Sequence, residues 1–287
     1  MVTGYRSTGS AERITRIATR KTQNILALFL SRGSYDLLLI TCDLWRVPAW
    51  LTGNKTLLAM LKSGMSIYEA FARVSMNWRG GDLKKEDPDK YALAKIQVLG
   101  LGYGCGWEKF ITIAAGYNVT LDEEKSKELV TGFRTNNPGI TDLWKTLNDA
   151  YRASVGDNFS MGLPSGRSLN YRQVCREVRS KRNAETKKYE KRFVYTAAIG
   201  TDREELYGGL LTENLVQATA RDVFGTPLLA LEKQVGDVIF HVHDEAICEV
   251  DQSVTVADVE NVMSVCPDWI AGLPVSARGK ESVSFTK

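Results

Sequence analysis

The stretch that most constrains the fold is residues 237–250, whose pattern predicts a β-hairpin. Apolar and polar residues alternate on both sides of a central break, as in strands that each bury one face. Asp244 and Glu245 stand at this break, where both side chains can reach solvent and a metal ion. Carboxylate oxygens are the ligands that hard divalent cations such as Mg²⁺ prefer. A plain turn explains the same residues, because Asp is common in turns.

Both histidines of the chain, His241 and His243, lie in this stretch. Their spacing would put them on one face of a strand. A His-x-His pair can bind zinc and makes a metallohydrolase a rival hypothesis, although zinc sites usually have three or four protein ligands. The five cysteines are scattered and no pair has CxxC spacing. They indicate neither a disulfide framework nor a zinc knuckle, and they fit a reducing cytoplasm.

The remaining sequence predicts helices and a few strands. Residues 35–42 are a short apolar run of strand-like length that ends at Asp43. Caps and periodicity predict helices over residues 46–75 with a break at 52–54, from Asp87 toward Gly100, from about 122 to 136, from 140 to about 154, and over 209–233. A second hairpin is predicted at 158–172 and a loop at 78–87. The predicted fold class is α+β, with a small antiparallel sheet.

Residues 90–104 combine a cation and an aromatic ring at a regular spacing. Tyr91, Lys95, Leu99 and Tyr103 recur every four residues and would share one helical face. Lys95 and Tyr103 would lie about 12 Å apart along the axis, roughly the span from a triphosphate to its base. An amphipathic helix followed by a glycine-rich loop explains the pattern equally well. A dinucleotide-binding loop fits poorly, because that motif needs a preceding strand.

Polar and basic residues suggest contacts with nucleic acid without proving them. Asn214, Gln217 and Arg221 fall on one helical face, and amide side chains suit the minor-groove acceptors that every base pair presents. A solvent-facing polar stripe is the simpler alternative. The net charge is only +3, but basic residues cluster at the N-terminus and again over residues 176–192. Such clusters neutralise phosphates or form a solvated charged surface. No apolar run reaches the roughly 18 residues of a membrane span, and residues 1–20 lack the apolar stretch of a secretory signal.

Several of these segments resemble motifs of the family A (DNA polymerase I-like) DNA polymerases of the phage type. His243-Asp244-Glu245 between apolar strands is similar to the family's His-Asp-Glu motif. Lys95-x₇-Tyr-Gly, ending in Leu-Gly-Leu-Gly-Tyr-Gly, resembles its fingers helix, and residues 213–222 resemble its primer-binding helix. Other similar segments follow in family order: residues 22–25, 49–53, 66–68, 163–167 and 267–274. The resemblance covers about residues 20–287.

The resemblance implies template-directed DNA synthesis from deoxynucleoside triphosphates (dNTPs) on primer–template DNA. It implies a palm from residues 1–55 and 200–287, built on a small antiparallel sheet with helices, and a mainly helical fingers insertion from residues 56–199. Asp43 and Asp244 would hold two Mg²⁺ ions, for which Mn²⁺ can substitute, with Glu245 and His243 supporting the metal hairpin. The implied nucleotide-binding residues are Lys95, Leu99, Tyr103 and Tyr68; the implied DNA-binding residues are Asn214, Gln217, Arg221, Arg167, Gln23 and Asn24.

The first palm motif departs from the family pattern Asp-x-Ser-Gln-x-Glu-x-Arg, because the Ser-Gln-x-Glu portion is absent. An ungapped alignment puts Leu39 at the aspartate position and leaves the site without chemistry. A deletion of about one helical turn keeps Asp43 there, directly after the apolar strand, and is the preferred alignment. Tyr91 also stands where the family usually has an arginine.

The residues before Gln23 are too few for the family's exonuclease-like domain and thumb. A separate chain that supplies either part is therefore a candidate partner, and a grip on duplex DNA without a thumb should be weak and strongly salt-dependent. The alternative to an enzyme is a catalytically inactive remnant that binds primer–template DNA or a partner chain. The expected location is the cytoplasm, of the host cell if the gene belongs to a phage.

Overall fold

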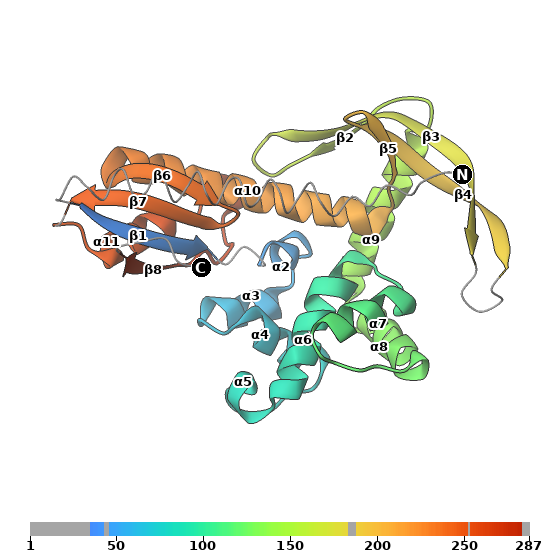
Figure 1. Cartoon of the computed structure of the whole chain (residues 1–287), viewed down its shortest axis with the longest axis horizontal. Helices are drawn as coiled ribbons and strands as arrows, with labels where there is room; N and C mark the ends of the chain where they lie inside the picture. The colour runs from blue at the N-terminus through green and yellow to red at the C-terminus, as the bar shows by residue number, and fades with distance from the viewer. Residues whose placement is uncertain (1–34, 43–45, 183–187, 252, 283–287) are drawn as a thin grey trace, which may run out of the picture. The chain divides into compact units, whose positions relative to one another are not determined.

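A computed structural model describes residues 35–42, 46–182, 188–251 and 253–282 and confirms the α+β class (Figure 1). The chain divides into two compact units. The first unit takes its described residues from the ranges 1–43, 224–265 and 275–287, and the second unit comprises 44–223 and 266–274. No helix in the described ranges combines the length and the apolar character needed to cross a membrane.

The first unit contains an antiparallel sheet of strand order β6-β7-β1-β8. Its strands are β1 (Tyr35–Cys42), β6 (Gly236–Val242), β7 (Glu245–Asp251) and β8 (Ala277–Ser282). The predicted strand at 35–42 and the predicted hairpin are thus confirmed, whereas β8 was not predicted. Ala246, Ile247 and Cys248 are consecutive and all buried, so β7 is covered on both faces. Helix α11 (Val256–Met263) packs against β1 and β8 and starts with a capping box at Thr255.

Most of the second unit is helical. Its helices are α2 (Val47–Leu51), α3 (Lys55–Lys62), α4 (Ile67–Ser75), α5 (Leu83–Glu86), α6 (Pro88–Gly100), α7 (Trp107–Gly116), α8 (Glu123–Asn136) and α9 (Pro138–Ala153). Side chains of Asn54, Asp87 and Asp122 accept hydrogen bonds from backbone N–H groups of α3, α6 and α8, which explains the predicted helix starts. The expected loop at 78–87 contains the short helix α5, because Asp82 caps it and Leu83 is fully buried.

A core of aromatic and aliphatic side chains holds α4 to α8 together. Phe71, Leu83, Ile96, Phe110 and Phe133 are among its buried members. The rings of Phe71 and Phe133 lie 5.8 Å apart between centroids, a normal spacing for packed aromatic pairs. This core fixes the position of α6, the helix on which the candidate nucleotide residues lie.

A second antiparallel sheet has the order β2-β3-β4-β5. Its strands are β2 (Phe159–Gly162), β3 (Ser168–Arg182), β4 (Tyr189–Ile199) and β5 (Asp202–Glu205). The predicted hairpin at 158–172 is confirmed, but β3 continues ten residues beyond it. Tyr151 of α9, Phe159, Tyr171 and Leu211 form the core between this sheet and the first part of α10 (Gly208–Gln234), the predicted long helix. Helix α10 gives residues up to Val223 to the second unit and those from Phe224 to the first.

Candidate nucleotide and DNA sites

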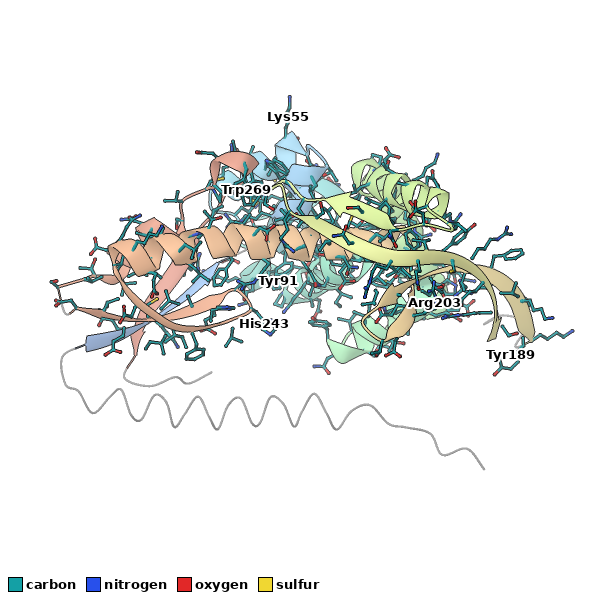
Figure 2. All side chains as sticks on the ribbon, turned by 90° about the horizontal axis from the view of Figure 1, so that it is seen from above. Lys55, Tyr91, Tyr189, Arg203, His243 and Trp269 are labelled. Carbon is teal, nitrogen blue, oxygen red and sulfur yellow. The ribbon has the colours of Figure 1, made fainter. Side chains whose placement is uncertain are left out.

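The turn of the β6–β7 hairpin carries the candidate metal ligands. His243 and Asp244 form the turn, and Val242 pairs with Glu245 across it. Figure 2 labels His243. His243 is exposed and has a φ of +54°, whereas Asp244 and Glu245 are half-buried. A positive φ is uncommon outside glycine and costs about 1–3 kcal/mol, and such outliers gather at functional sites. A residue with a strained backbone conformation therefore lies directly beside Asp244, the candidate metal ligand.

The carboxylates of Asp244 and Glu245 form no ion pair with any described residue. Among the described residues, neither Asp244 nor Glu245 forms a salt bridge or a side-chain hydrogen bond. No three His, Cys, Asp or Glu side chains gather into a metal site within the described ranges. A cation held at this turn would need a further ligand, and the donor chemistry of the pair suits a hard ion such as Mg²⁺.

The end of β1 runs beside this turn. Thr41 pairs with Glu245, whereas Leu39 pairs with Ile247, two residues deeper in the sheet. Asp43, the predicted first metal ligand, lies outside the described residues and follows the last residue of β1 by one position in the sequence. The predicted DNA-binding residues Gln23 and Asn24 also lie outside them.

The histidines do not form the pair that a zinc site needs. His241 lies in β6, and its ring meets Phe224 edge-on at 6.0 Å between centroids. His243 lies in the turn, so the expectation that both share a strand face is wrong. The hairpin turn begins one residue earlier than the alternation suggested, and a bulge between Val238 and Phe240 also shifts the register.

Helix α6 presents Lys95 among tyrosine rings. The Lys95 ammonium nitrogen lies 6.0 Å from the ring centroid of Tyr68 and 5.2 Å from that of Tyr117. Within the described ranges Lys95 forms no salt bridge, so its charge is oriented by the rings without being neutralised. Tyr91, which stands one turn before Lys95, meets Tyr68 edge-on at 5.5 Å. Tyr117 was missed by the sequence analysis, since its distance in the chain from Lys95 gives no periodic signal.

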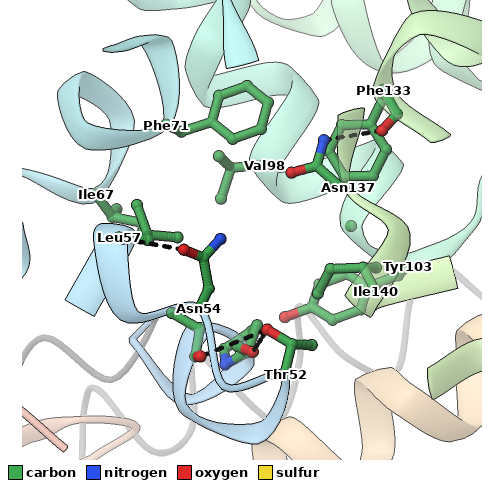
Figure 3. Close-up of a pocket in the computed structure, with 13 residues that line it drawn as sticks. Thr52, Asn54, Leu57, Ile67, Phe71, Val98, Tyr103, Phe133, Asn137 and Ile140 are labelled. Atoms are coloured by element: carbon green, nitrogen blue, oxygen red, sulfur yellow. Dashed lines mark hydrogen bonds between the residues drawn. The ribbon is translucent and has the colours of Figure 1, made fainter. Parts of the chain in front are cut away.

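Tyr103 lies in a 3₁₀ turn, Leu101–Tyr103, that follows the end of α6 at Gly100. The shared α-helical face therefore includes Tyr91, Lys95 and Leu99 but stops before Tyr103. Burial raises the pKa of the Tyr103 hydroxyl well above its usual value. The Tyr103 side chain borders a cavity of about 70 Å³ whose lining is mostly apolar (Figure 3).

Close backbone contacts hold the Tyr103 turn in place. The Trp144 indole N–H donates to the carbonyl oxygen of Gly102 at 3.1 Å. A Cβ atom at Gly209 would overlap the carbonyl oxygen of Tyr103, and one at Gly208 would overlap that of Trp144. Glycine at position 209 thus lets the start of α10 approach the turn, and glycine at position 208 lets it approach α9.

The predicted DNA-facing residues of α10 differ in their surroundings. Asn214 is half-buried and its amide donates to the Tyr171 hydroxyl at 2.9 Å. Gln217 is exposed and bonds to Glu213 one turn away, and Arg221 is also exposed. These three residues share one side of α10 as predicted. No sequence pattern indicates Tyr171, because it reaches Asn214 from a different element.

Arg167 belongs to the turn between β2 and β3. Its guanidinium forms a salt bridge of 2.9 Å with Asp222 and donates to the carbonyl oxygen of Ala218 at 3.3 Å. Ser165 also bonds to Asp222. This turn is therefore fastened to α10 by Asp222, whose side chain is 15% exposed. Arg167 thus supports the position of α10 directly.

Comparison with known proteins identifies the class of this fold. The structure superposes on the "POL domain of Pol1 from M. smegmatis complex with DNA primer-template and dNTP" with a TM-score of 0.59 and 14% identity, covering 88% of this chain and 40% of that chain. Its fold is that of a DNA polymerase domain.

The sequence is 32% identical over 252 residues to a DNA polymerase of Bacillus phage SP02, covering 82% of this chain and 38% of that protein. No protein-family profile matches the chain. The chain is therefore related to the polymerase region of family A DNA polymerases. It spans about two fifths of the length of the proteins that it matches.

Proposed function

We propose that the chain carries out template-directed DNA synthesis, by transfer of nucleotides from dNTPs to the 3′-hydroxyl of a primer. The observation that carries this proposal is the 32% identity to a phage DNA polymerase over 82% of the chain. In this proposal the palm comprises residues 1–55 and 200–287 and the fingers comprise residues 56–199. Primer–template DNA and dNTPs are the partners, and a separate chain that supplies a thumb or exonuclease is a further candidate.

The nucleotide would bind along α6. The Lys95 ammonium, which forms no salt bridge with a described residue, would neutralise part of the triphosphate charge, with Tyr68 and Tyr117 keeping it extended. Leu99 would pack against the sugar and base, and Tyr103 would position the templating base. Because Tyr91 provides no cation, Lys95 carries more of the phosphate binding than it would beside an arginine.

The primer end would lie along α10. Asn214, held by the Tyr171 hydroxyl, and Gln217 would bond to minor-groove acceptors, which are nearly the same for all base pairs. Such contacts detect a correctly shaped primer end without reading its sequence. Arg221 and Arg167 would lie toward the phosphates.

Two Mg²⁺ ions would be held by Asp43 and Asp244, with Mn²⁺ as a substitute. The unbalanced carboxylates of Asp244 and Glu245 support this assignment, because a divalent cation would offset their mutual repulsion. Magnesium bound there would supply the positive charge that phosphoryl transfer needs. Glu245 would support the ion site, and His243 would hold the turn that presents Asp244.

Asp43 is preferred over Leu39 as the first metal ligand because of the strand register. Thr41 lies opposite Glu245, so the chain reaches the level of the turn only as β1 ends. Leu39 lies opposite Ile247, about 7 Å further from the turn at the usual rise per residue. Its side chain offers no ligand atom.

Primer extension on a synthetic primer–template with Mg²⁺, and then with Mn²⁺, tests the proposal. We expect incorporation that Asp244→Asn and Asp43→Asn each abolish. Asp237→Asn is the matched control, since Asp237 is exposed at the open end of the same hairpin. Loss of activity in Asp244→Asn with retention in Asp43→Asn would refute the Asp43 assignment alone.

The missing Ser-Gln-x-Glu segment favours a second candidate, a catalytically inactive remnant that binds primer–template DNA or a partner chain. DNA binding by the folded protein without incorporation under either metal would establish the remnant and reject the enzyme. Stoichiometric zinc in elemental analysis of the purified protein would instead indicate a metallohydrolase.

A further inference from the structure

Strands β3 and β4 continue past the sheet as a two-stranded ribbon, formed by residues 176–182 and 189–195. β2 pairs only with Ser168–Tyr171 of β3, and β5 pairs only with Thr196–Ile199 of β4. Among the described strands, none pairs with either edge of the ribbon (Figure 1). Tyr189 lies at its far end (Figure 2).

The strand register sorts the ribbon's side chains onto two unlike faces. Arg176 lies opposite Tyr195, and Val178 lies opposite Phe193. Directly opposed residues share a face and alternate along each strand, so these four residues lie together with Tyr189 and Lys191. We call this the aromatic face. None of its positions from 176 to 182 and from 189 to 195 carries an acidic residue.

The opposite face balances its charges internally. Arg179 pairs with Glu177 at 3.1 Å, and Arg203 of β5 pairs with the same carboxylate at 3.2 Å. Arg192 pairs with Glu205 at 2.7 Å. A hydrogen bond from the Thr196 hydroxyl, with help from Arg179 and Arg203, holds the pKa of Glu177 below its usual value. Arg179, Arg192 and Arg203 are thus already partnered by carboxylates.

The aromatic face exposes apolar area that a soluble surface normally hides. Tyr189 is 76% exposed, Phe193 58% and Val178 57%. The Arg176 guanidinium carbon lies 3.6 Å from the Phe193 ring centroid, so the cation is stacked on a ring. At the base of the face, the Arg152 guanidinium lies 4.7 Å from the ring centroid of Tyr195. Arg176 and Arg152 contact rings here, whereas Arg179 and Arg192 on the other face pair with carboxylates.

We propose that the aromatic face of the ribbon binds single-stranded DNA, such as the unpaired part of a template. Proteins that hold single strands combine cations along the backbone with rings on which bases stack. Alternate residues of a strand lie about 7 Å apart, so Phe193 and Tyr195 offer successive rings along β4, with Lys191 beside them. This inference rests on the proposed DNA polymerase function, but it concerns a contact that needs no active site.

A partner protein is the less favoured occupant, because its surface would have to be acidic as well as apolar to match the aromatic face. DNA meets both requirements with one regular polymer, whose phosphates attract Arg176 and Lys191 while its bases cover the rings. The segregation of Arg176, Lys191 and the rings from acidic residues is thus the observation that favours nucleic acid.

Fluorescence anisotropy of the full chain with a labelled oligothymidylate, without primer, dNTP or metal, tests the proposal. Tyr189→Ala and Phe193→Ala should each weaken binding about fivefold or more, since stacking on one ring strengthens binding by that factor or more. Arg176→Gln should also lower the slope of log affinity against log salt by about 0.7, the value for one phosphate of a single strand.

Arg179→Gln is the matched control, because it removes the same charge from the same strand but from the opposite face. We expect it to leave both affinity and salt slope near those of the unaltered chain. Photo-crosslinking of an iododeoxyuridine oligonucleotide, followed by peptide mass spectrometry, should label residues 189–195 and not β2.

Unchanged binding in both aromatic variants would overturn the proposal, as would equal losses in Arg176→Gln and Arg179→Gln. Reduced self-association or reduced binding of another protein in the aromatic variants, with unchanged DNA binding, would assign the face to a protein partner and also reject it. Primer extension by the same variants is measured separately. If the chain extends primers but the ribbon variants bind single-stranded DNA normally, this inference is rejected and the proposed function still stands.

Discussion

Lys95 is the residue on which nucleotide binding by α6 depends. Charged hydrogen bonds contribute about 1.5–3 kcal/mol, so Lys95→Gln should raise the KM for dNTPs at least about tenfold in primer extension. Lys90→Gln is the control on the same helix, since the Lys90 ammonium already pairs with Asp87 at 3.3 Å. Equal KM values for the Lys95 and Lys90 variants would show that the phosphates bind elsewhere.

His243 tests whether strain at the hairpin turn serves function. Its φ of +54° suits glycine, so His243→Gly should raise the melting temperature or leave it unchanged, while His243→Ala should lower it. Both variants lose the imidazole, and only glycine relieves the backbone. If the ring matters for activity, both variants should lose primer extension equally. Destabilisation by glycine as large as that by alanine would contradict the strain argument.

At the scale of elements, the start of α10 depends on glycine contacts. Gly209→Ala should destabilise the protein by about 1–3 kcal/mol, because the added methyl group would meet the Tyr103 carbonyl oxygen. Gly225→Ala lies on the same helix with no atom within 4 Å of the new Cβ, and should stabilise it by up to about 1 kcal/mol. Chemical denaturation measures both changes. A neutral Gly209→Ala variant would show that the contact yields easily.

Elements with strong local signals were predictable from the sequence. Asp87 followed by Pro88 defines the start of α6, and the apolar run at 35–42 matches β1. The β3–β4 ribbon was not predicted, because its two exposed faces lack the alternation of buried and exposed positions that marks a strand. The sequence showed a basic cluster over residues 176–192, and these residues are largely exposed as a charged surface would be. It did not show how the charges and the aromatic rings are arranged on the two faces.

The candidate site was predictable residue by residue but not in its geometry. The spacing of Lys95 predicted its place on α6, yet the 3₁₀ turn at Tyr103 arises from glycines whose effect depends on contacts with Trp144 and α10. Likewise, Asn214 was identified from helical spacing, while its partner Tyr171 comes from β3. Periodicity in the sequence predicts which residues share a face of one helix or strand. It does not predict these contacts, because each of them joins two elements.

At the scale of the whole molecule, the chain forms two compact units, each with its own buried side chains. Ile247 and Val259 belong to the first unit, and Phe110 and Phe133 to the second. Helix α10 contributes to both units, with fully buried residues in each, such as Leu211 and Leu231. The helix continues through the boundary between Val223 and Phe224, and Pro227 lies inside it just beyond that point.

Two buried thiols allow each unit to be followed separately. Burial raises the pKa of Cys248 in the first unit to about 12 and also raises that of Cys105 in the second. At pH 8 only about one part in ten thousand of a thiol with a pKa near 12 is thiolate, against roughly a quarter for an ordinary cysteine. Reaction with N-ethylmaleimide should therefore spare both thiols in the folded protein and modify the partly exposed Cys175 and Cys266.

Urea then exposes each thiol as its unit unfolds and its pKa returns to the ordinary value. Because the units have separate cores, we expect Cys248 and Cys105 to become labelled at different urea midpoints, as measured by peptide mass spectrometry after short pulses. Cys175 serves as the control that reacts throughout. Coincident midpoints would show that α10 couples the units into one cooperative structure, and labelling of Cys248 in native buffer would contradict its burial in β7.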